Sequence, residues 1–192
     1  MNIYVDWDGV VQDTIEGMIP YLNNDLKMNL KKEDFHTLWW TGVFKKSKEE
    51  TQKIYYDFYQ TPYFSKIPFI DGAIDGIKKL SKEHALILVS SRQQYLREYT
   101  KYLIEQNFSE AIKKIRFTGN LQDPFSPYII TKEQVCIEEK IDIAIEDDID
   151  YVKKISPLIK KVLLFNQPWN QTNTLPDNVK RVYNWNEVLE NI

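Results

Sequence analysis

Residues 2–11 read Asn-Ile-Tyr-Val-Asp-Trp-Asp-Gly-Val-Val, and this stretch decides the fold. The apolar residues 3–5 predict a buried strand, and Asp6, Asp8 and Gly9 follow it at once. In an open α/β sheet, ligands bind at the carboxyl ends of the parallel strands. The sequence therefore predicts two carboxylates at a ligand-binding edge, where Asp6 is suited to nucleophilic attack and Asp8 to proton transfer.

An Asp-Gly pair is also common in plain turns, so this interpretation depends on the rest of the chain. Residues 85–92, Ala-Leu-Ile-Leu-Val-Ser-Ser-Arg, predict a second strand that ends in the hydroxyl groups of Ser90 and Ser91. Residues 142–148, Asp-Ile-Ala-Ile-Glu-Asp-Asp, predict a further strand that ends in an acidic cluster. Parallel strands would bring both ends to the same edge as the first two aspartates.

A cation is expected at the start of a helix between these two strands. Thr131 and Gln134 have the spacing of a capping box, which places Lys132 in the first helical turn. Lys140 is the alternative, since it lies nearer the acidic strand in sequence. Its position near the end of the helix is more typical of a surface lysine that complements the helix dipole.

These four motifs, in this order, resemble those of the haloacid dehalogenase (HAD) superfamily of phosphohydrolases: Asp-x-Asp, a Ser or Thr after a strand, a Lys, and an acidic pair. The chain is similar in particular to the 5'(3')-deoxyribonucleotidase-like branch. The residues that carry the resemblance are 6–11, 89–92, 141–147, 163–170, Arg181, Val182 and Trp185. It spans nearly the whole chain.

The resemblance implies a catalytic role for each motif. Asp6 would be the nucleophile that forms an aspartyl-phosphate, and Asp8 the general acid and base. Ser90, Ser91 and Lys132 would bind the phosphate. Mg²⁺ would be held by Asp6, the main-chain carbonyl of Asp8, and Asp147, because hard oxygen ligands suit this ion and its charge offsets that of the phosphate.

Two assignments within the motifs stay open. The family usually has Asp-Asp where this chain has Glu146, Asp147 and Asp148, so the frame is ambiguous by one residue. We favour Asp147 as the metal ligand, with Glu146 or Asp148 orienting bound water or Lys132, or serving as the alternative ligand. Arg92 either binds the substrate or faces solvent.

Strands that alternate with helices predict a three-layer α/β fold of Rossmann-like type, with a parallel sheet and helices on both faces. The expected strands are 2–6, 85–90, 114–118, 142–146 and 160–165. The expected covering helices are one over 73–82 and one that follows Ser90 and Ser91 and runs to about 107. Residues 1–12 and 71–192 would form the phosphohydrolase core. Residues 167–170, Gln-Pro-Trp-Asn, follow the last predicted core strand and either border the site or form a structural loop; we favour the loop.

Residues 13–70 are too long for a simple crossover, and we expect them to form a small helical cap inserted after the first strand. We call them the cap segment. Ser47 and Glu50 predict the start of one helix, and Pro20 is expected to bend or end another early. The segment is rich in aromatic residues, and we expect Trp39 and Trp40 to face the site, where a flat ring can stack on a nucleobase.

Composition restricts the class of protein. With 192 residues, 43% of them hydrophobic, the chain can bury one core, and no apolar stretch approaches the length of a membrane span. The net charge of −3 and the dispersed lysines argue against a broad nucleic-acid-binding surface. Cys136 is the lone cysteine and is expected to be a core residue. We expect a cytoplasmic protein without a membrane partner.

The predicted function is that of a Mg²⁺-dependent phosphomonoester hydrolase, a 5'-nucleotidase acting on (deoxy)nucleoside monophosphates. The alternative enzymes are phosphatases of sugar phosphates or of nucleic-acid 3' ends. A phosphoacceptor signalling domain is the alternative from another class, because it uses the same residue types. The order of the motifs disfavours it, since such domains place the acidic pair before the phosphoacceptor.

Overall fold

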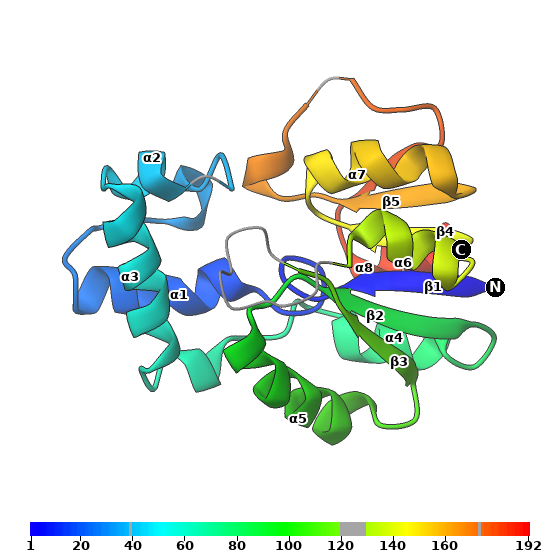
Figure 1. Cartoon of the computed structure of the whole chain (residues 1–192), viewed down its shortest axis with the longest axis horizontal. Coiled ribbons are helices and arrows are strands. Elements are labelled where there is room, and N and C mark those ends of the chain that lie inside the picture. The colour runs from blue at the N-terminus through cyan, green and yellow to red at the C-terminus, as the bar shows by residue number, and fades with distance from the viewer. Residues whose placement is uncertain (39, 120–129, 173) are drawn as a thin grey trace.

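The structure is a computed structural model that describes residues 1–38, 40–119, 130–172 and 174–192. In this part of the chain the strands form one six-stranded sheet, and every neighbouring pair is parallel (Figure 1). The strands are β1 (Asn2–Asp6), β2 (Ala85–Ser90), β3 (Ile112–Phe117), β4 (Ile143–Glu146), β5 (Lys161–Phe165) and β6 (Val179–Val182), in the order β3-β2-β1-β4-β5-β6. Because β1 lies between β2 and β4, the three strands that carry motifs end side by side.

Helices cover both faces of the sheet, which confirms the predicted three-layer α/β fold. Helices α4 (Ala73–Leu80), α5 (Arg97–Phe108) and α8 (Trp185–Glu190) pack on one face, and α6 (Lys132–Glu138) and α7 (Ile149–Ile155) on the other. On β1, Ile3 and Val5 belong to the first buried cluster and Tyr4 to the second. Because side chains alternate along a strand, Asp6 points to the same face as Tyr4, toward α6.

Apart from shifts of one or two residues at the ends of elements, the structure differs from the predicted elements of the core in two places. β6 was not expected, because a strand of four residues, with two valines around Lys180 and Arg181, is too short to give a clear pattern. It lies at the edge of the sheet and pairs with β5 alone. α5 begins at Arg97, after a 3-10 turn at Gln94–Leu96, and not directly after Ser91.

Three helices, α1 (Thr14–Asn24), α2 (Trp40–Phe44) and α3 (Lys48–Tyr59), lie in the cap segment, beyond the carboxyl ends of the strands (Figure 1). Ser47 and Glu50 form the predicted capping box of α3. The expectation that Pro20 ends α1 early was wrong: the helix continues through it. Pro20 and Glu16 lie on the exposed side of α1, where water can bind the carbonyl group that proline leaves without a partner. The remaining 3-10 turns are Lys32–Asp34, Phe64–Lys66, Ser156–Leu158 and Pro168–Asn170.

The cap segment has a hydrophobic cluster of its own, which includes two buried residues from the rest of the chain and packs against partly buried Tyr99. Its members include Met18, Phe35 and Phe58, together with Leu96 and Trp169 from outside the segment. The chain enters and leaves the segment side by side: the amide of Asp13 donates to the carbonyl of Pro68, and that of Ile70 to the carbonyl of Val11, each at 2.9 Å. These paired connections place the cap segment over the carboxyl edge of the sheet.

Candidate active site

The buried pair of Asp6 and Lys132 lies at the carboxyl edge of the sheet. Asp6 ends β1 and is 6% exposed, and Lys132 begins α6 and is 3% exposed. The Lys132 ammonium donates to Asp6 Oδ1 and to Glu146 Oε2, both at 2.8 Å. The structure thus joins the first, third and fourth sequence motifs in one contact.

The capping box predicted from the sequence sets the position of Lys132. The Thr131 hydroxyl accepts from the amide of Gln134 at 3.1 Å, and the Gln134 side chain accepts from the amide of Thr131 at 2.9 Å. Burial alone would lower the pKa of Lys132, but the charges of Asp6 and Glu146 outweigh it and raise the pKa well above its usual value. Lys132 is therefore a fixed cation at this edge.

Glu146 is engaged at both carboxylate oxygens. Its Oε1 accepts from the amides of Asp147 and Asp148, both at 3.1 Å, while Oε2 accepts from Lys132 and from the hydroxyl of Tyr4. Tyr4 precedes Asp6 by two residues on β1, so strand alternation puts its ring under the site. Sequence analysis did not single out Tyr4, although the same alternation marks it.

Asp6, Glu146 and Asp147 each offer a carboxylate oxygen within 4.8 Å of the others, and all three are buried. Burial raises the pKa values of Asp6 and Asp147 well above normal, and the neighbouring carboxylates raise them further. Lys132 brings one positive charge to this cluster of three acids. A hard divalent cation would offset the remaining charge, so the donor set fits a metal such as Mg²⁺.

The loop after β5 holds Asp147 in place. The indole of Trp169 donates to Asp147 Oδ2, and the side-chain amide of Asn170 donates to the carbonyl of Asp147, both at 2.8 Å. Gly9, at φ 77°, passes so close that an added Cβ would lie 2.2 Å from Asp147 Oδ2. The sequence-based interpretation of residues 167–170 as a structural loop therefore missed their contact with the acidic cluster.

Asp148 lies outside the carboxylate cluster. It is the N-cap of α7, and its Oδ1 accepts from the amide of Asp150 at 2.8 Å. Burial, followed by the charge of Glu146, raises the pKa of Asp148. The structure places Glu146 and Asp147, but not Asp148, with Asp6, and Asp147 as the metal ligand stays a prediction.

The two serines after β2 have different surroundings. Ser90 ends the strand and is 1% exposed, and its hydroxyl accepts from the amide of Arg92 at 3.2 Å. Ser91 is half-buried, and its hydroxyl accepts from Thr118 Oγ1 at 3.2 Å. The N-caps of the following 3-10 turn and of α5 are Gln93 and Leu96, so Ser91 caps neither element.

Arg92 is buried, so of the two alternatives left open by the sequence, a solvent-facing side chain is wrong. Its Nε donates to Asp8 Oδ2 at 2.9 Å and its Nη2 to Asp8 Oδ1 at 2.8 Å. The Asp8 side chain is 37% exposed, whereas that of Arg92 is 3% exposed. Thr14 donates a second hydrogen bond to Asp8 Oδ1. The sequence offered no signal for this pairing, since the two residues are 84 positions apart.

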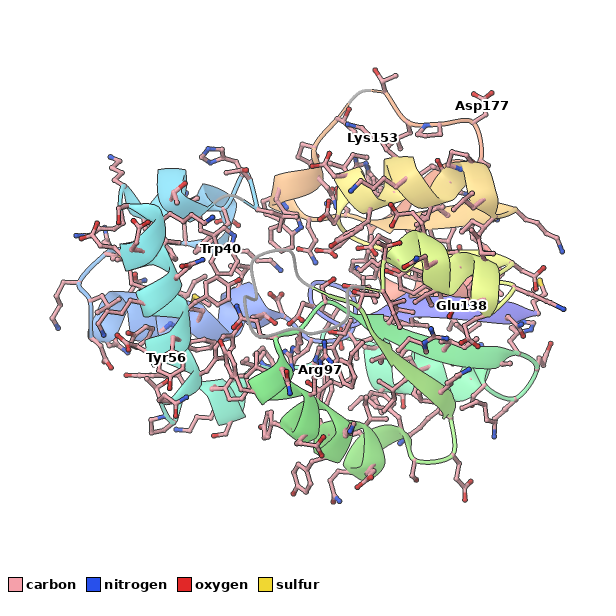
Figure 2. All side chains as sticks on the ribbon, in the orientation of Figure 1. Trp40, Tyr56, Arg97, Glu138, Lys153 and Asp177 are labelled. Atoms are coloured by element: carbon pink, nitrogen blue, oxygen red, sulfur yellow. The ribbon has the colours of Figure 1, made fainter. Side chains whose placement is uncertain are left out.

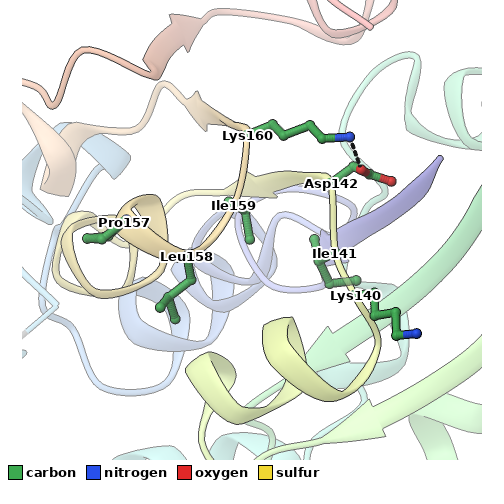
Figure 3. A pocket seen from close by; sticks show the side chains of 7 residues that line it. All are labelled: Lys140, Ile141, Asp142, Pro157, Leu158, Ile159 and Lys160. Carbon is green, nitrogen blue, oxygen red and sulfur yellow. Dashed lines mark hydrogen bonds and ion pairs between the residues drawn. The ribbon is translucent and has the colours of Figure 1, made fainter.

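Lys140, the alternative to Lys132, lies at the opposite end of β4. It follows α6 and lines a surface pocket together with Asp142 and Lys160, whose side chains form an ion pair at 2.6 Å (Figure 3). Because β4 begins here and ends at Glu146, the full length of the strand separates Lys140 from the acidic cluster.

Trp40 packs inside the cap segment (Figure 2). It is 6% exposed, and the ring of Tyr55 stacks on it with centroids 4.3 Å apart. Burial raises the pKa values of Tyr55 and Tyr59 well above normal, and in both cases the charge of Asp8 adds to the effect. The hydroxyls of these two half-buried tyrosines thus lie near enough to Asp8 for its charge to act on them. The prediction for Trp39 lies outside the described residues.

Solved structures share this fold over nearly the whole chain. A haloacid dehalogenase-like hydrolase from Streptococcus pneumoniae matches with a TM-score of 0.70 and 18% identity, covering 99% of this chain and 97% of its own. The HAD-hydrolase YfnB from Bacillus subtilis, bound to magnesium, matches at 0.65 and 13%, covering 98% and 96%. CbbY from Rhodobacter sphaeroides, in complex with phosphate, matches at 0.60 and 11%, covering 97% and 95%. The fold is therefore that of the HAD-like hydrolases.

A comparison of the sequence with models of protein families identifies the family. The model for "5' nucleotidase, deoxy (Pyrimidine), cytosolic type C protein" (NT5C) matches residues 1–192, and the chain belongs to this family. It is a phosphatase of the HAD class, as the four motifs indicated. No curated protein matches the chain. Within the described ranges, every helix is too short or too polar to span a bilayer.

Proposed function

We propose that the protein is a Mg²⁺-dependent 5'-nucleotidase that removes phosphate from (deoxy)nucleoside monophosphates through an aspartyl-phosphate on Asp6. The observation that carries this proposal is the buried grouping of Asp6 and Lys132 with two further acids, at the strand edge where this fold class binds its ligands. Membership of the 5'-nucleotidase family supports the substrate class.

The metal would be held by carboxylates of Asp6 and Asp147 and by the main-chain carbonyl of Asp8. When bound, it would offset the charges of the nucleophile and the phosphate, which otherwise repel each other. Glu146 would act through Lys132, whose ammonium it holds at 2.8 Å. The magnesium and phosphate in two of the similar structures are consistent with these ligands.

The chemistry assigned to this chain has two steps. A carboxylate oxygen of Asp6 attacks phosphorus, the bond from phosphorus to the leaving oxygen breaks, and Asp8 donates a proton to that oxygen. Water then attacks phosphorus, its proton returns to Asp8, and the bond to Asp6 breaks. Lys132 and the hydroxyl of Ser90 would hold the other phosphoryl oxygens, with Ser91 as a further contact.

The cap segment, residues 13–70, would select the substrate over a core formed by residues 1–12 and 71–192. Tyr55 and Tyr59 would face the substrate, since both rings are half-buried and the charge of Asp8 raises the pKa of both hydroxyls. Stacking of a base on an aromatic ring contributes about 1–3 kcal/mol, enough to favour a nucleotide over a sugar phosphate. The cytosolic type in the family description supports an intracellular setting.

A phosphate-release screen tests the proposal. Purified protein with Mg²⁺ would be given 5'- and 3'-nucleoside monophosphates with ribose or deoxyribose, sugar phosphates, and a 3'-phosphorylated oligonucleotide. We expect the highest kcat/KM with a nucleoside monophosphate, loss of activity in excess chelator, and recovery with Mg²⁺ but not Ca²⁺. Equal rates on glucose phosphates and deoxynucleotides would refute the nucleotidase assignment, and full activity in chelator would refute the metal site.

A further inference from the structure

The pairing of Arg92 with Asp8 has an unusual distribution of burial. The guanidinium is enclosed, with its side chain 3% exposed, and two of its nitrogens meet the two oxygens of a carboxylate that is 37% exposed. An exposed carboxylate can ordinarily choose among several rotamers. Here the planar guanidinium group of Arg92 favours the Asp8 rotamer in which both carboxylate oxygens accept hydrogen bonds.

Arg92 is itself held by groups that belong to the core. Its Nη2 donates to Gln12 Oε1 at 2.8 Å, and its Nη1 donates to Thr100 Oγ1 at 3.1 Å. Gln12 also accepts from the indole of Trp7 at 2.9 Å, and the guanidinium carbon lies 5.6 Å from the Trp7 ring centroid. Arg92 therefore has hydrogen-bond partners in the core in addition to Asp8.

We propose that Arg92 is a positioning residue: its guanidinium directs the Asp8 carboxyl group toward the oxygen that leaves the substrate. The inference rests on the proposed role of Asp8 as acid and base. Direct binding of phosphate by Arg92 is a poorer account, because its Nε and Nη2 already donate to Asp8 and Gln12. Thr14, from the start of α1, supplies a further hydrogen bond to Asp8 Oδ1.

The leaving group reveals whether Arg92 acts in this way. In the first step the Asp6 oxygen bonds to phosphorus, the leaving oxygen departs with the bonding electrons, and the Asp8 proton neutralises it. An alkoxide needs that proton, whereas p-nitrophenolate is stable without it. Because kcat/KM reports only steps up to the first irreversible one, it isolates this transfer from the later attack by water.

The experiment compares Arg92→Met with wild type on alkyl and aryl phosphates in saturating Mg²⁺. We expect kcat/KM to fall about 10²-fold or more on alkyl phosphates and less than about tenfold on p-nitrophenyl phosphate. Arg92→Lys, which keeps the buried charge, should show the same selectivity with a smaller loss, since an ammonium cannot hold both oxygens. This second variant answers the question if Arg92→Met does not fold.

Two further variants separate positioning from a structural role. Asp8→Asn should give the same leaving-group profile, and adding Arg92→Met to it should cost less than about threefold, because both changes remove one function. Arg116→Met is the matched control: Arg116 also pairs with carboxylates, those of Glu138 and Glu139, and should show no leaving-group dependence.

Equal losses on both ester types, or full additivity with Asp8→Asn, would overturn the proposal for Arg92. Because the series consists of simple esters, it does not depend on nucleotide preference. A wild-type enzyme that hydrolyses these esters but ignores nucleotides would refute the substrate assignment alone.

Discussion

The carboxyl edge of the sheet and the cap segment are held together by different interactions. At the edge, charged groups meet at fixed hydrogen-bond distances, as where Lys132 joins Asp6 and Glu146 at 2.8 Å. In the cap segment, aromatic rings such as Trp40, Tyr55 and Phe58 pack in a hydrophobic cluster. The function of the edge therefore depends on the positions of individual charged atoms. The stability of the cap segment depends on how closely its aromatic rings pack.

Different consequences of mutation follow. A hydrogen-bonded ionic cluster loses function when one atom changes, because a buried charge is left without its partner. A packed cluster loses stability in proportion to the volume removed. The predictions below test this division, from the largest expected effect to the smallest.

Replacing the nucleophile should produce the largest effect. Asp6→Asn keeps the shape of the side chain but removes its charge, so we expect phosphate release to fall by at least about 10⁴-fold with the fold intact. Phosphate release and circular dichroism measure the two properties. Asp148→Asn is the matched control, because Asn is also a good N-cap and Asp148 lies outside the cluster. Near-wild-type turnover by Asp6→Asn would eliminate the mechanism.

Truncating a ring in the cap segment should act mainly on stability. Trp40→Ala removes a side chain that is 6% exposed, so we expect a loss of about 3–5 kcal/mol in the free energy of unfolding. Urea denaturation measures it, and Tyr56→Ala, at a residue that is 55% exposed, provides the control. A selective loss of nucleotide turnover at unchanged stability would instead restore the prediction that Trp40 faces the substrate.

These two regions also differ in how far the sequence predicts them. At the edge, strand alternation and one capping box place Asp6, Glu146 and Lys132, because each is local to an element that the sequence pattern predicts. In the cap segment the same rules give helices but not the side that faces the site. Whether Trp40 stacks on Tyr55 or on a base depends on contacts between helices.

Contacts between residues far apart in the sequence also could not be predicted. The contacts of Arg92 with Asp8 and of Trp169 with Asp147 join loops that follow different strands. A loop that follows a strand carries no periodic signal for the direction of its side chains. The quoted Gln-Pro-Trp-Asn stretch was the available clue, since it follows a core strand and so lies near the ligand-binding edge.

Trp169 links the two regions, because it packs in the cap cluster while its indole binds a carboxylate of the edge. Trp169→Phe keeps most of the packing and removes the hydrogen bond to Asp147 Oδ2. We expect Mg²⁺ affinity to fall about 10–100-fold, as for other partners of metal ligands. Isothermal titration with Mg²⁺ alone measures this without turnover.

The control for Trp169 is Trp185→Phe. Trp185 also donates one buried indole hydrogen bond, to the carbonyl of Val10 at 2.9 Å, but touches none of the three clustered acids. Its loss should lower stability and leave Mg²⁺ affinity within about threefold. Unchanged affinity in Trp169→Phe would show that the indole only holds the cap segment to the edge.

The smallest effect concerns the packing beneath the edge. Cys136 lies on α6 one turn after Lys132, is 3% exposed, and has its pKa raised by burial from 9.0 to about 12. The folded state therefore keeps the thiol protonated at pH values where the unfolded chain ionises. This contribution to stability is fully present below about pH 9 and is lost as the pH rises toward 12.

As the lone cysteine, Cys136 can be followed without ambiguity. We expect a disulfide reagent at pH 9 to modify it at the rate of global unfolding, and at the ordinary rate of a free thiol once urea is added. Between pH 8 and pH 10, wild type should lose about 1 kcal/mol more stability than Cys136→Ala, which has no thiol to ionise. Rapid modification of the native protein would mean that α6 opens independently of the sheet. Lys132, which begins α6, would then not be held in a fixed position. That result would contradict the view that the edge is rigid and that only the cap segment depends on packing.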